Sequence, residues 1–283
     1  MNPKVTPQQV KELRDRTGVG MGKCKEALVQ ASGNMEEAID ILRKSGMAQA
    51  VKKEGRETHE GVIKSLVTDE CVALIEVNAE TDFVVKNENF QKFVELLVEE
   101  VCITRPTSVA EFLVQKYSRD SEMTIDQLRA VTIQTLGENI KIHKLEIFPI
   151  KENHSIGVYS HGGGKLVTLV EVSGASDVQD FAKDLAMHIA AESPEYLSSD
   201  EVPHRVKEHE REIARAQIKN KPLEITEKIV EGKLHAYYKT VCLLEQNYVK
   251  DPNLTVDKFV KTVSCDYGKD LKITQFLRWH VGE

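Results

Sequence analysis

Hydrophobic residues recur at helical spacing over residues 6–45, in three consecutive stripes. Within each stripe the spacing is i, i+3, i+4 or i+7, which is typical of a helix with one buried face. Thr6 with Pro7, and later Asn34, stand where the start of a helix is favoured. We predict three short helices around a small core, and then a linker over residues 47–60, which lacks such a stripe; whether part of this linker is helical stays open. The apolar positions are Val10 and Leu13, then Cys24, Ala27, Leu28 and Ala31, then Met35, Ala38, Ile39 and Leu42.

A different pattern begins after residue 60 and occurs twice. The first copy reads GVIKSLVTDECVALIEVN and then FQKFVELLVEEV, and the second reads GVYSHGGGKLVTLVEVS and then VQDFAKDLAMHIAA. Each copy runs from Gly-Val through a polar or glycine-rich turn into β-branched and aliphatic residues, and ends in an amphipathic helical stretch. This repeat predicts a β-hairpin followed by a helix, made twice. The predicted fold class is α+β, with antiparallel sheets covered on one face by helices.

The two copies differ in the segment between the second strand and the helix. Val77 lies 16 positions before Phe93, whereas the matching Val172 lies only 9 positions before Phe181. The additional residues fall in the segment AETDFVVKNENF, and an insertion on a duplicated scaffold is a natural place for function. Phe83 in this segment is either a core residue, as most phenylalanines are, or an exposed aromatic that inserts into another protein. The insertion favours the exposed alternative.

A helical arm interrupts the second copy over about residues 200–246. Two amphipathic segments separated by Pro222 predict two antiparallel helices there. The chain then ends in the alternating pattern KITQFLRWHVGE, which predicts a final strand that returns to the sheet. We predict a domain organisation of residues 1–55 as the helical module with its linker, 56–145 as the first α+β subdomain, and 146–283 as the second subdomain with the arm.

Composition indicates a globular protein of more than one domain, because 283 residues exceed what one core usually holds. No apolar run reaches the roughly 20 residues that cross a bilayer, and the start MNPKVTPQQV lacks the order of a signal peptide, so we expect a cytoplasmic protein that binds no membrane.

Five dispersed cysteines without a CxxC pair predict reduced thiols. The net charge of −7 combines +3 over residues 1–55 with −10 beyond them, which favours a protein partner over nucleic acid.

The sequence contains no recognisable catalytic constellation. Its nine histidines are dispersed without metal-ligand spacing, and no GxSxG motif is present. The glycines before Lys165 resemble a phosphate loop only superficially, because a Walker A loop leads into a helix and Leu166 begins a strand-like run. We expect a hairpin turn there, with His161 exposed beside it, and we expect His188 to be a structural histidine. We therefore predict no catalytic residue, no metal site and no cofactor.

Three separated motifs occur in order along the chain. They are LRDRTGVGMGKCKEAL near the start, TDFVVKN from Thr81, and GENI from Gly137 to Ile140. With these motifs, practically the whole chain resembles the bacterial elongation factor Ts family, the guanine-nucleotide exchange factors of elongation factor Tu. The resemblance implies a UBA-like three-helix module, two related α+β subdomains and a coiled-coil arm. It also implies a role in translation, with elongation factor Tu as the partner in its GDP-bound and nucleotide-free forms.

The resemblance further implies which residues contact the partner. The family's TDF loop enters beside the partner's magnesium and nucleotide site, and it maps here to Thr81, Asp82, Phe83 and Val84. The N-terminal module binds the partner's nucleotide domain, which maps to Lys11, Arg14 and Met21; where the family often has a second methionine, this chain has Gly22. The opposite end of the partner is approached from the side of the second subdomain, which maps to Gly137, His161 and Val249.

Other functions stay open on the sequence alone. The helical module could make the chain a UBA-like adaptor without exchange activity, with the remaining residues as scaffold. A nucleotide-binding enzyme built on the GGGK turn is the other alternative, and the hairpin interpretation disfavours it. A homodimer through the arm is also open. Some family members continue past the VGE segment with a helical tail that touches the partner, and the resemblance implies that this contact is absent or replaced here.

Overall fold

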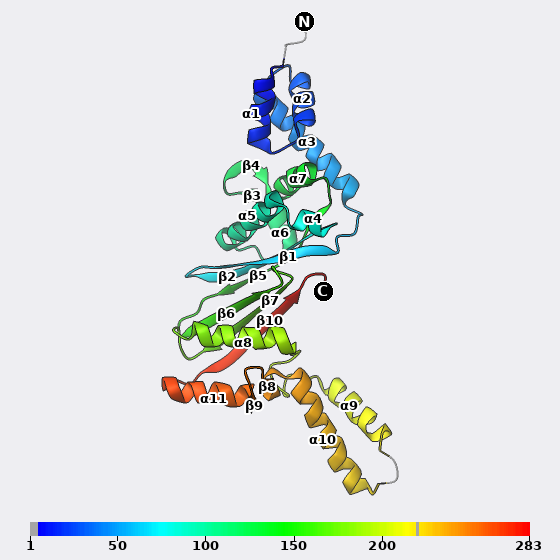
Figure 1. The fold of residues 1–283 in the computed structure, drawn as a ribbon, viewed down its shortest axis with the longest axis vertical. Helices are drawn as coiled ribbons and strands as arrows, with labels where there is room; N and C mark the ends of the chain where they lie inside the picture. Colours follow the sequence, from blue (N-terminus) through cyan, green and yellow to red (C-terminus); the bar gives the residue numbers. More distant parts are fainter. Residues whose placement is uncertain (1–4, 219–220) are drawn as a thin grey trace. The chain divides into compact units, whose positions relative to one another are not determined.

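The computed structural model describes residues 5–218 and 221–283 of the chain. The chain forms two compact units (Figure 1). Unit 1 contains Met1–Pro149 together with His280–Glu283, and unit 2 contains Ile150–Trp279. Helices precede and cover antiparallel sheet, so the predicted α+β class is confirmed.

The three predicted N-terminal helices are present in unit 1. Thr6 starts the first with a capping box: its hydroxyl accepts from the Gln9 N–H at 3.2 Å, and the Gln9 side chain accepts from the Thr6 N–H at 3.0 Å. Asn34 starts the third by accepting from the N–H groups of Glu36 and Glu37. The apolar stripes meet in one small core. The helices are α1 (Pro7–Thr17), α2 (Met21–Gln30) and α3 (Met35–Lys53).

Helix α3 is longer than the sequence pattern predicts. Residues 47–60 lack an apolar stripe and are predicted as a linker, but the helix continues to Lys53. Gly46 and Ala50 are buried, and a side chain at Gly46 would lie 3.3 Å from the carbonyl oxygen of Ala130 in α7 (Ile125–Leu136). The part of the predicted linker up to Lys53 is therefore helical, which the sequence pattern left open, and its fully buried residues are small. Such residues allow close packing of two helices without a strong hydrophobic signal.

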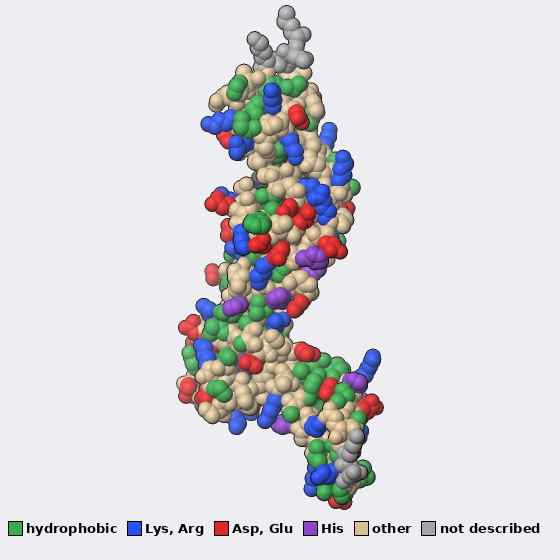
Figure 2. Space-filling view, turned by 45° about the vertical axis from the view of Figure 1, so that its right-hand side comes forward, with side chains coloured by type: hydrophobic (Ala, Val, Ile, Leu, Met, Phe, Trp, Pro, Cys, Tyr) green, Lys and Arg blue, Asp and Glu red, His purple; other side chains and the backbone are tan. Residues whose placement is uncertain are grey.

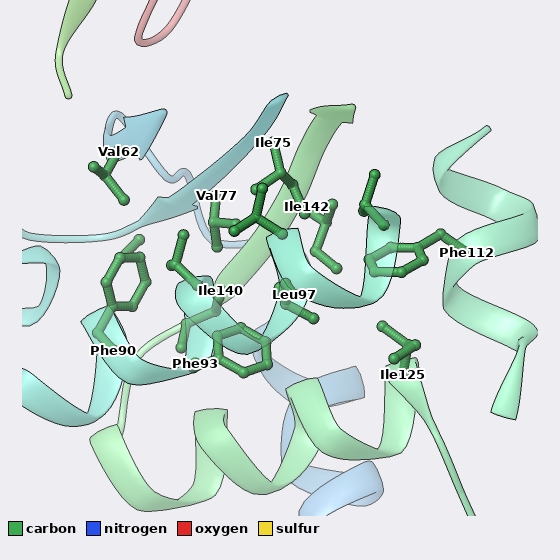
Figure 3. Close-up of a cluster of buried hydrophobic side chains, with 14 of the residues drawn as sticks. Val62, Ile75, Val77, Phe90, Phe93, Leu97, Phe112, Ile125, Ile140 and Ile142 are labelled. Carbon is green, nitrogen blue, oxygen red and sulfur yellow. The ribbon is translucent and has the colours of Figure 1, made fainter. Parts of the chain in front are cut away.

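The sheet of unit 1 has the order β1-β2-β5, and both pairings are antiparallel. The central strand β2 is buried along its whole length. Helices α5, α6 and α7 cover one face of the sheet, and Phe93 and Leu97 of α5 belong to the core that fills the space between (Figure 3). The bounds are β1 (Glu60–Val67), β2 (Cys71–Ala79), α4 (Asp82–Val85), α5 (Glu88–Thr104), α6 (Val109–Val114), β3 (Lys116–Tyr117), β4 (Asp120–Thr124), α7 (Ile125–Leu136) and β5 (Ile140–Pro149).

Unit 2 has a second sheet, with the order β10-β7-β6. Helix α8 packs on its β6-β7 hairpin so closely that a side-chain carbon at Gly157 would lie 2.1 Å from the carbonyl carbon of Ala182. Only glycine fits at this point. The predicted final strand is present as β10. The bounds are β6 (His154–His161), β7 (Leu166–Ser173), α8 (Gln179–Glu192), α9 (His204–Ala216), α10 (Leu223–Val241), the 3-10 turn η1 (Leu243–Glu245), β8 (Asn247–Tyr248), β9 (Asp251–Thr255), α11 (Val256–Tyr267) and β10 (Lys272–His280).

The duplication extends further than the sequence pattern indicates. After the hairpin and its helix, each unit adds a small strand pair, a helix and a strand that joins the sheet: β3-β4, α7 and β5 in unit 1, and β8-β9, α11 and β10 in unit 2. Glu76 and Glu171, which the repeat aligns, are both buried in the central strand of their sheets. Each carboxylate pairs with a lysine, Lys144 at 3.2 Å and Lys151 at 3.0 Å respectively. The repeat thus preserves a buried glutamate in the central strand, but the lysine comes from a different place in each unit: Lys144 lies in β5, whereas Lys151 precedes β6.

The predicted arm consists of α9 and α10, which lie antiparallel (Figure 1). Two ion pairs of 3.0 Å connect the helices, Arg211 with Glu231 and Arg215 with Glu227. Residues 219–220 between the helices lie outside the described residues. Hydrophobic side chains gather at the end of the arm where α10 begins, and Leu223 is exposed there (Figure 2).

Candidate functional site

The segment that only the first repeat carries forms a short helix, α4. It lies between the end of β2 and the start of α5, where unit 2 passes directly from β7 to α8. Thr81 has extended backbone and caps α4, because its hydroxyl accepts a hydrogen bond from the Val84 N–H at 3.4 Å. Val85 is buried in the core of unit 1 and Val84 packs against that core. The inner side of α4 is therefore anchored, and Phe83 lies on its outer side.

Phe83 is 82% exposed, more than any other large hydrophobic residue among those the structure describes. An exposed aromatic ring leaves apolar area in water and contributes little to folding. Asp82 beside it forms an ion pair with Lys86 at 2.7 Å, and this hydrogen bond raises the pKa of Lys86. The loop therefore presents an aromatic ring next to a carboxylate, on a helix whose other residues are held by the core.

The GENI segment directly contacts this loop. Helix α7 ends at Leu136 and is capped by Gly137, whose φ of 84° is favourable only for glycine. The next residue, Glu138, accepts hydrogen bonds from the Thr81 N–H at 3.0 Å and the Thr81 hydroxyl at 2.6 Å. The resemblance groups Gly137 with His161 and Val249, but Gly137 belongs to unit 1 and the other two belong to unit 2. Glu138 is the residue that sequence reasoning missed; its only signal was membership of the GENI motif.

The N-terminal residues singled out from the sequence lie on the surface of the three-helix module. Lys11 and Arg14 are exposed on α1, three positions apart and so on one side of the helix. Met21 is 48% exposed at the start of α2 and lines a surface hollow of about 360 Å³ together with Val10 and Gly22. Two cations and an apolar hollow on one small module can bind an acidic or mixed protein surface.

In unit 2, His161 and Val249 both lie at hairpin turns. His161 ends β6, is exposed, and hydrogen-bonds with the Tyr159 hydroxyl at 3.2 Å. The glycines that follow it have positive φ and connect β6 to β7, so the predicted hairpin turn is confirmed and the GGGK sequence is not followed by a helix. Val249 is 40% exposed between β8 and β9, and its N–H donates to Nδ1 of the buried His188 at 3.2 Å.

His188 is the structural histidine that the sequence predicts. Its Nε2 lies 3.0 Å from the Gln246 side-chain oxygen, so Nε2–H donates there while Nδ1 accepts from Val249. Burial lowers the pKa of His188, because the charged form would lose its hydration. A neutral ring with both nitrogens bonded is not available for acid–base chemistry.

The part of the chain that the structure describes contains no group of three or more His, Cys, Asp or Glu side chains able to hold a metal ion. All five cysteines are free, as predicted. None of the described helices is long and apolar enough to span a bilayer.

Comparison with known proteins identifies similar chains. A family model described as "Elongation factor TS" matches residues 80–283, which include the TDF loop, the GENI segment and the whole of unit 2. The elongation factor Ts of Protochlamydia amoebophila is 53% identical over 279 residues, covering 99% of both chains. Those of Chlamydia muridarum and Chlamydia felis are 44% and 45% identical over 275 residues, covering 97% of this chain and 98% of theirs.

Proposed function

This chain belongs to the elongation factor Ts family, and from that premise we propose that it is a translation factor that binds elongation factor Tu·GDP and promotes release of GDP. It acts as a guanine-nucleotide exchange factor and catalyses no chemical reaction. The observation that carries this proposal is the exposure of Phe83 on an anchored one-turn helix. In the free protein such a residue exposes apolar area to water, which is unfavourable, and insertion into a partner buries that area.

Exchange requires a coupling free energy between two ligands of the partner. If this chain binds nucleotide-free elongation factor Tu more tightly than the GDP form, it must weaken GDP binding by the same factor. We propose that Phe83 inserts beside the partner's magnesium and nucleotide site and displaces groups that hold the cation. Asp82 orients or repels polar groups there, and Thr81 and Val84 complete the loop. Loss of the cation leaves the phosphate charge unbalanced, so GDP dissociates.

Two further surfaces hold the partner while the loop acts. Lys11, Arg14 and Met21 of the three-helix module bind the nucleotide domain. His161 and Val249 of unit 2, with Gly137 of unit 1, provide the other contacts. The charge distribution supports a protein partner, since a slightly basic module is joined to an acidic body. The protein would act in the cytoplasm without nucleic acid, membrane or cofactor, and self-association through the arm is an additional proposal.

The test is the rate of labelled GDP release from elongation factor Tu, with and without the variant Phe83→Ala. An aromatic anchor contributes about 2 kcal/mol or more at an interface, which corresponds to about 30-fold slower stimulated release. Val114→Ala removes an exposed side chain (74% exposed) elsewhere in unit 1 and serves as the control. Release at the wild-type rate with Phe83→Ala would refute insertion of the ring.

Variants of the helical module distinguish an exchange factor from a UBA-like adaptor without exchange activity. Removing residues 1–55 would also remove Gly46 and Ala50 from their contacts with the rest of unit 1, so truncation would perturb the core. The double variant Lys11→Glu, Arg14→Glu changes only exposed side chains. An exchange factor with this change binds its partner more weakly but still accelerates GDP release at saturating concentration, whereas an adaptor accelerates nothing in either form.

A further inference from the structure

The Glu138 carboxylate connects the end of α7 to the loop that bears Phe83. It accepts two hydrogen bonds from one residue, from the Thr81 N–H at 3.0 Å and from the Thr81 hydroxyl at 2.6 Å. Hydrogen bonds to a charged acceptor are stronger than those between neutral groups. The Thr81 hydroxyl has a single proton and donates it to Glu138. Its lone pairs are therefore free to face the Val84 N–H, from which the hydroxyl oxygen accepts a hydrogen bond at 3.4 Å. Glu138 thus orients the group that caps α4.

The corner that contains Glu138 is itself fixed on its other side. The Asn139 N–H donates to the Glu80 carboxylate at 2.6 Å, and the buried Asn139 side chain donates to the Arg56 carbonyl at 2.9 Å. Arg56 in turn pairs with Glu80 at 3.3 Å. One polar network therefore joins the GENI segment at Asn139, Glu80 before α4, and Arg56 after α3. Movement of Glu138 relative to the loop would break several of these bonds.

The geometry points to Glu138 as a positioning residue for nucleotide exchange: through Thr81, its carboxylate sets the orientation of α4 and hence of Phe83. This inference rests on the proposed function of Phe83. The exposed ring has few contacts of its own, so its direction is set by the backbone of α4. Four residues are too few to form a stable helix in isolation. Thr81 with Glu138 holds one end of α4, and the Gln91 side chain, which donates to the Val85 carbonyl at 2.6 Å, holds the other.

The chemistry of the pair suggests a graded set of variants. Glu138→Gln keeps the size of the side chain but replaces one accepting oxygen with an NH₂ group, which faces a donor of Thr81 and cannot accept from it. Thr81→Val removes the hydroxyl and with it both the hydroxyl's bond to Glu138 and the cap of α4, while the bond from the Thr81 N–H to Glu138 remains. Thr81→Ser retains the hydroxyl and should restore both. Glu122→Gln makes the same carboxylate-to-amide change on an exposed residue of β4 and is the matched control.

The experiment measures amide hydrogen exchange over residues 81–86 in the full-length free protein, together with stimulated GDP release and equilibrium binding to elongation factor Tu. For Glu138→Gln and Thr81→Val we expect at least tenfold faster exchange in this segment and unchanged exchange in β2. Stimulated release should slow about tenfold, while the Kd for the partner changes less than threefold. Thr81→Ser and Glu122→Gln should behave as wild type in all three assays. A merely structural role would instead speed exchange throughout unit 1.

Phe83→Ala separates failure of this inference from failure of the proposed function. If Phe83→Ala slows release but Glu138→Gln leaves release or the exchange of residues 81–86 unchanged, the positioning role is overturned and the function of Phe83 stands. If Phe83→Ala stimulates GDP release at the wild-type rate, insertion of the ring is refuted, and the inference that Glu138 orients this ring for nucleotide exchange fails with it. In the double variant, Glu138→Gln should add little to the defect of Phe83→Ala, since no ring is left to orient; a full tenfold further loss would contradict the inference.

Discussion

Replacing Phe83 by alanine should leave the stability of the free protein almost unchanged. A fully enclosed phenylalanine buries roughly 150–250 Å². Phe83 is 82% exposed, so the area it hides is only about 30–45 Å², worth about 1 kcal/mol at roughly 25 cal/mol per Å². Alanine has a higher helix propensity than phenylalanine by about 0.5 kcal/mol, and position 83 lies within α4. The two effects oppose each other, and we expect a net loss of about 0.5 kcal/mol.

Phe90 provides the matched comparison, because it is fully buried seven positions further along the chain, on α5. Phe90→Ala should lower the free energy of unfolding by about 3–5 kcal/mol through lost burial and the cavity left behind. Equilibrium unfolding in urea, followed by far-ultraviolet circular dichroism, measures both variants against wild type. A loss above about 2 kcal/mol for Phe83→Ala would mean that the ring is a core residue in solution, and it would remove the main support for its insertion into a partner.

Two other predictions concern unit 2. Gly157→Ala should destabilise the protein by about 2 kcal/mol or more, because the new carbon would lie 2.1 Å from the Ala182 carbonyl carbon. Gly232→Ala, in the interior of α10 with open space around it, should instead stabilise the protein by up to about 1 kcal/mol. Thermal unfolding of the two variants and the wild type measures both effects. Burial lowers the pKa of His188 below its usual value, so the unfolded chain binds this proton more readily. The stability that the neutral His188 contributes is complete above about pH 6.5 and is lost as the pH falls through the lowered pKa. The fall in Tm between pH 7.5 and 5.5 should therefore be smaller in His188→Gln than in the wild type.

The hydrophobic pattern predicted the elements that bury at least one large apolar side chain in a helical or strand period. The stripes of α1 and α2, the two hairpins and α5 and α8 follow from side chains such as Leu13 and Phe93, which are buried because transfer from water drives folding. The sequence pattern left the second half of α3 undecided because Gly46 and Ala50 pack by fitting closely and bury little apolar area. Periodicity reports the area of apolar side chains and does not report how closely two backbones approach.

The sequence likewise predicted only part of the candidate site: the inserted segment with Phe83, but not the contact of this segment with Glu138. Comparing the two repeats identified the inserted segment and favoured an exposed Phe83, since each copy serves as a reference for the other. The contact of Glu138 with Thr81 spans 57 positions, and no local pattern indicates which of many polar residues will meet. The GENI motif marked this region only through the family resemblance, which carried no information on the internal contact.

With the function proposed for Phe83, the insertion of α4 into one copy of a duplicated fold separates stability from function within unit 1. Unit 2 forms the same hairpin, covering helix and third strand without such a helix, so the fold does not require α4. Val85 and the contacts of Thr81 with Glu138 hold the insertion on a scaffold that is stable for other reasons. Phe83 is therefore free of any packing role, and its exposure costs the protein little. Polar contacts can therefore orient α4 precisely, while Phe83, the residue proposed to act on the partner, remains open to selection for that partner alone.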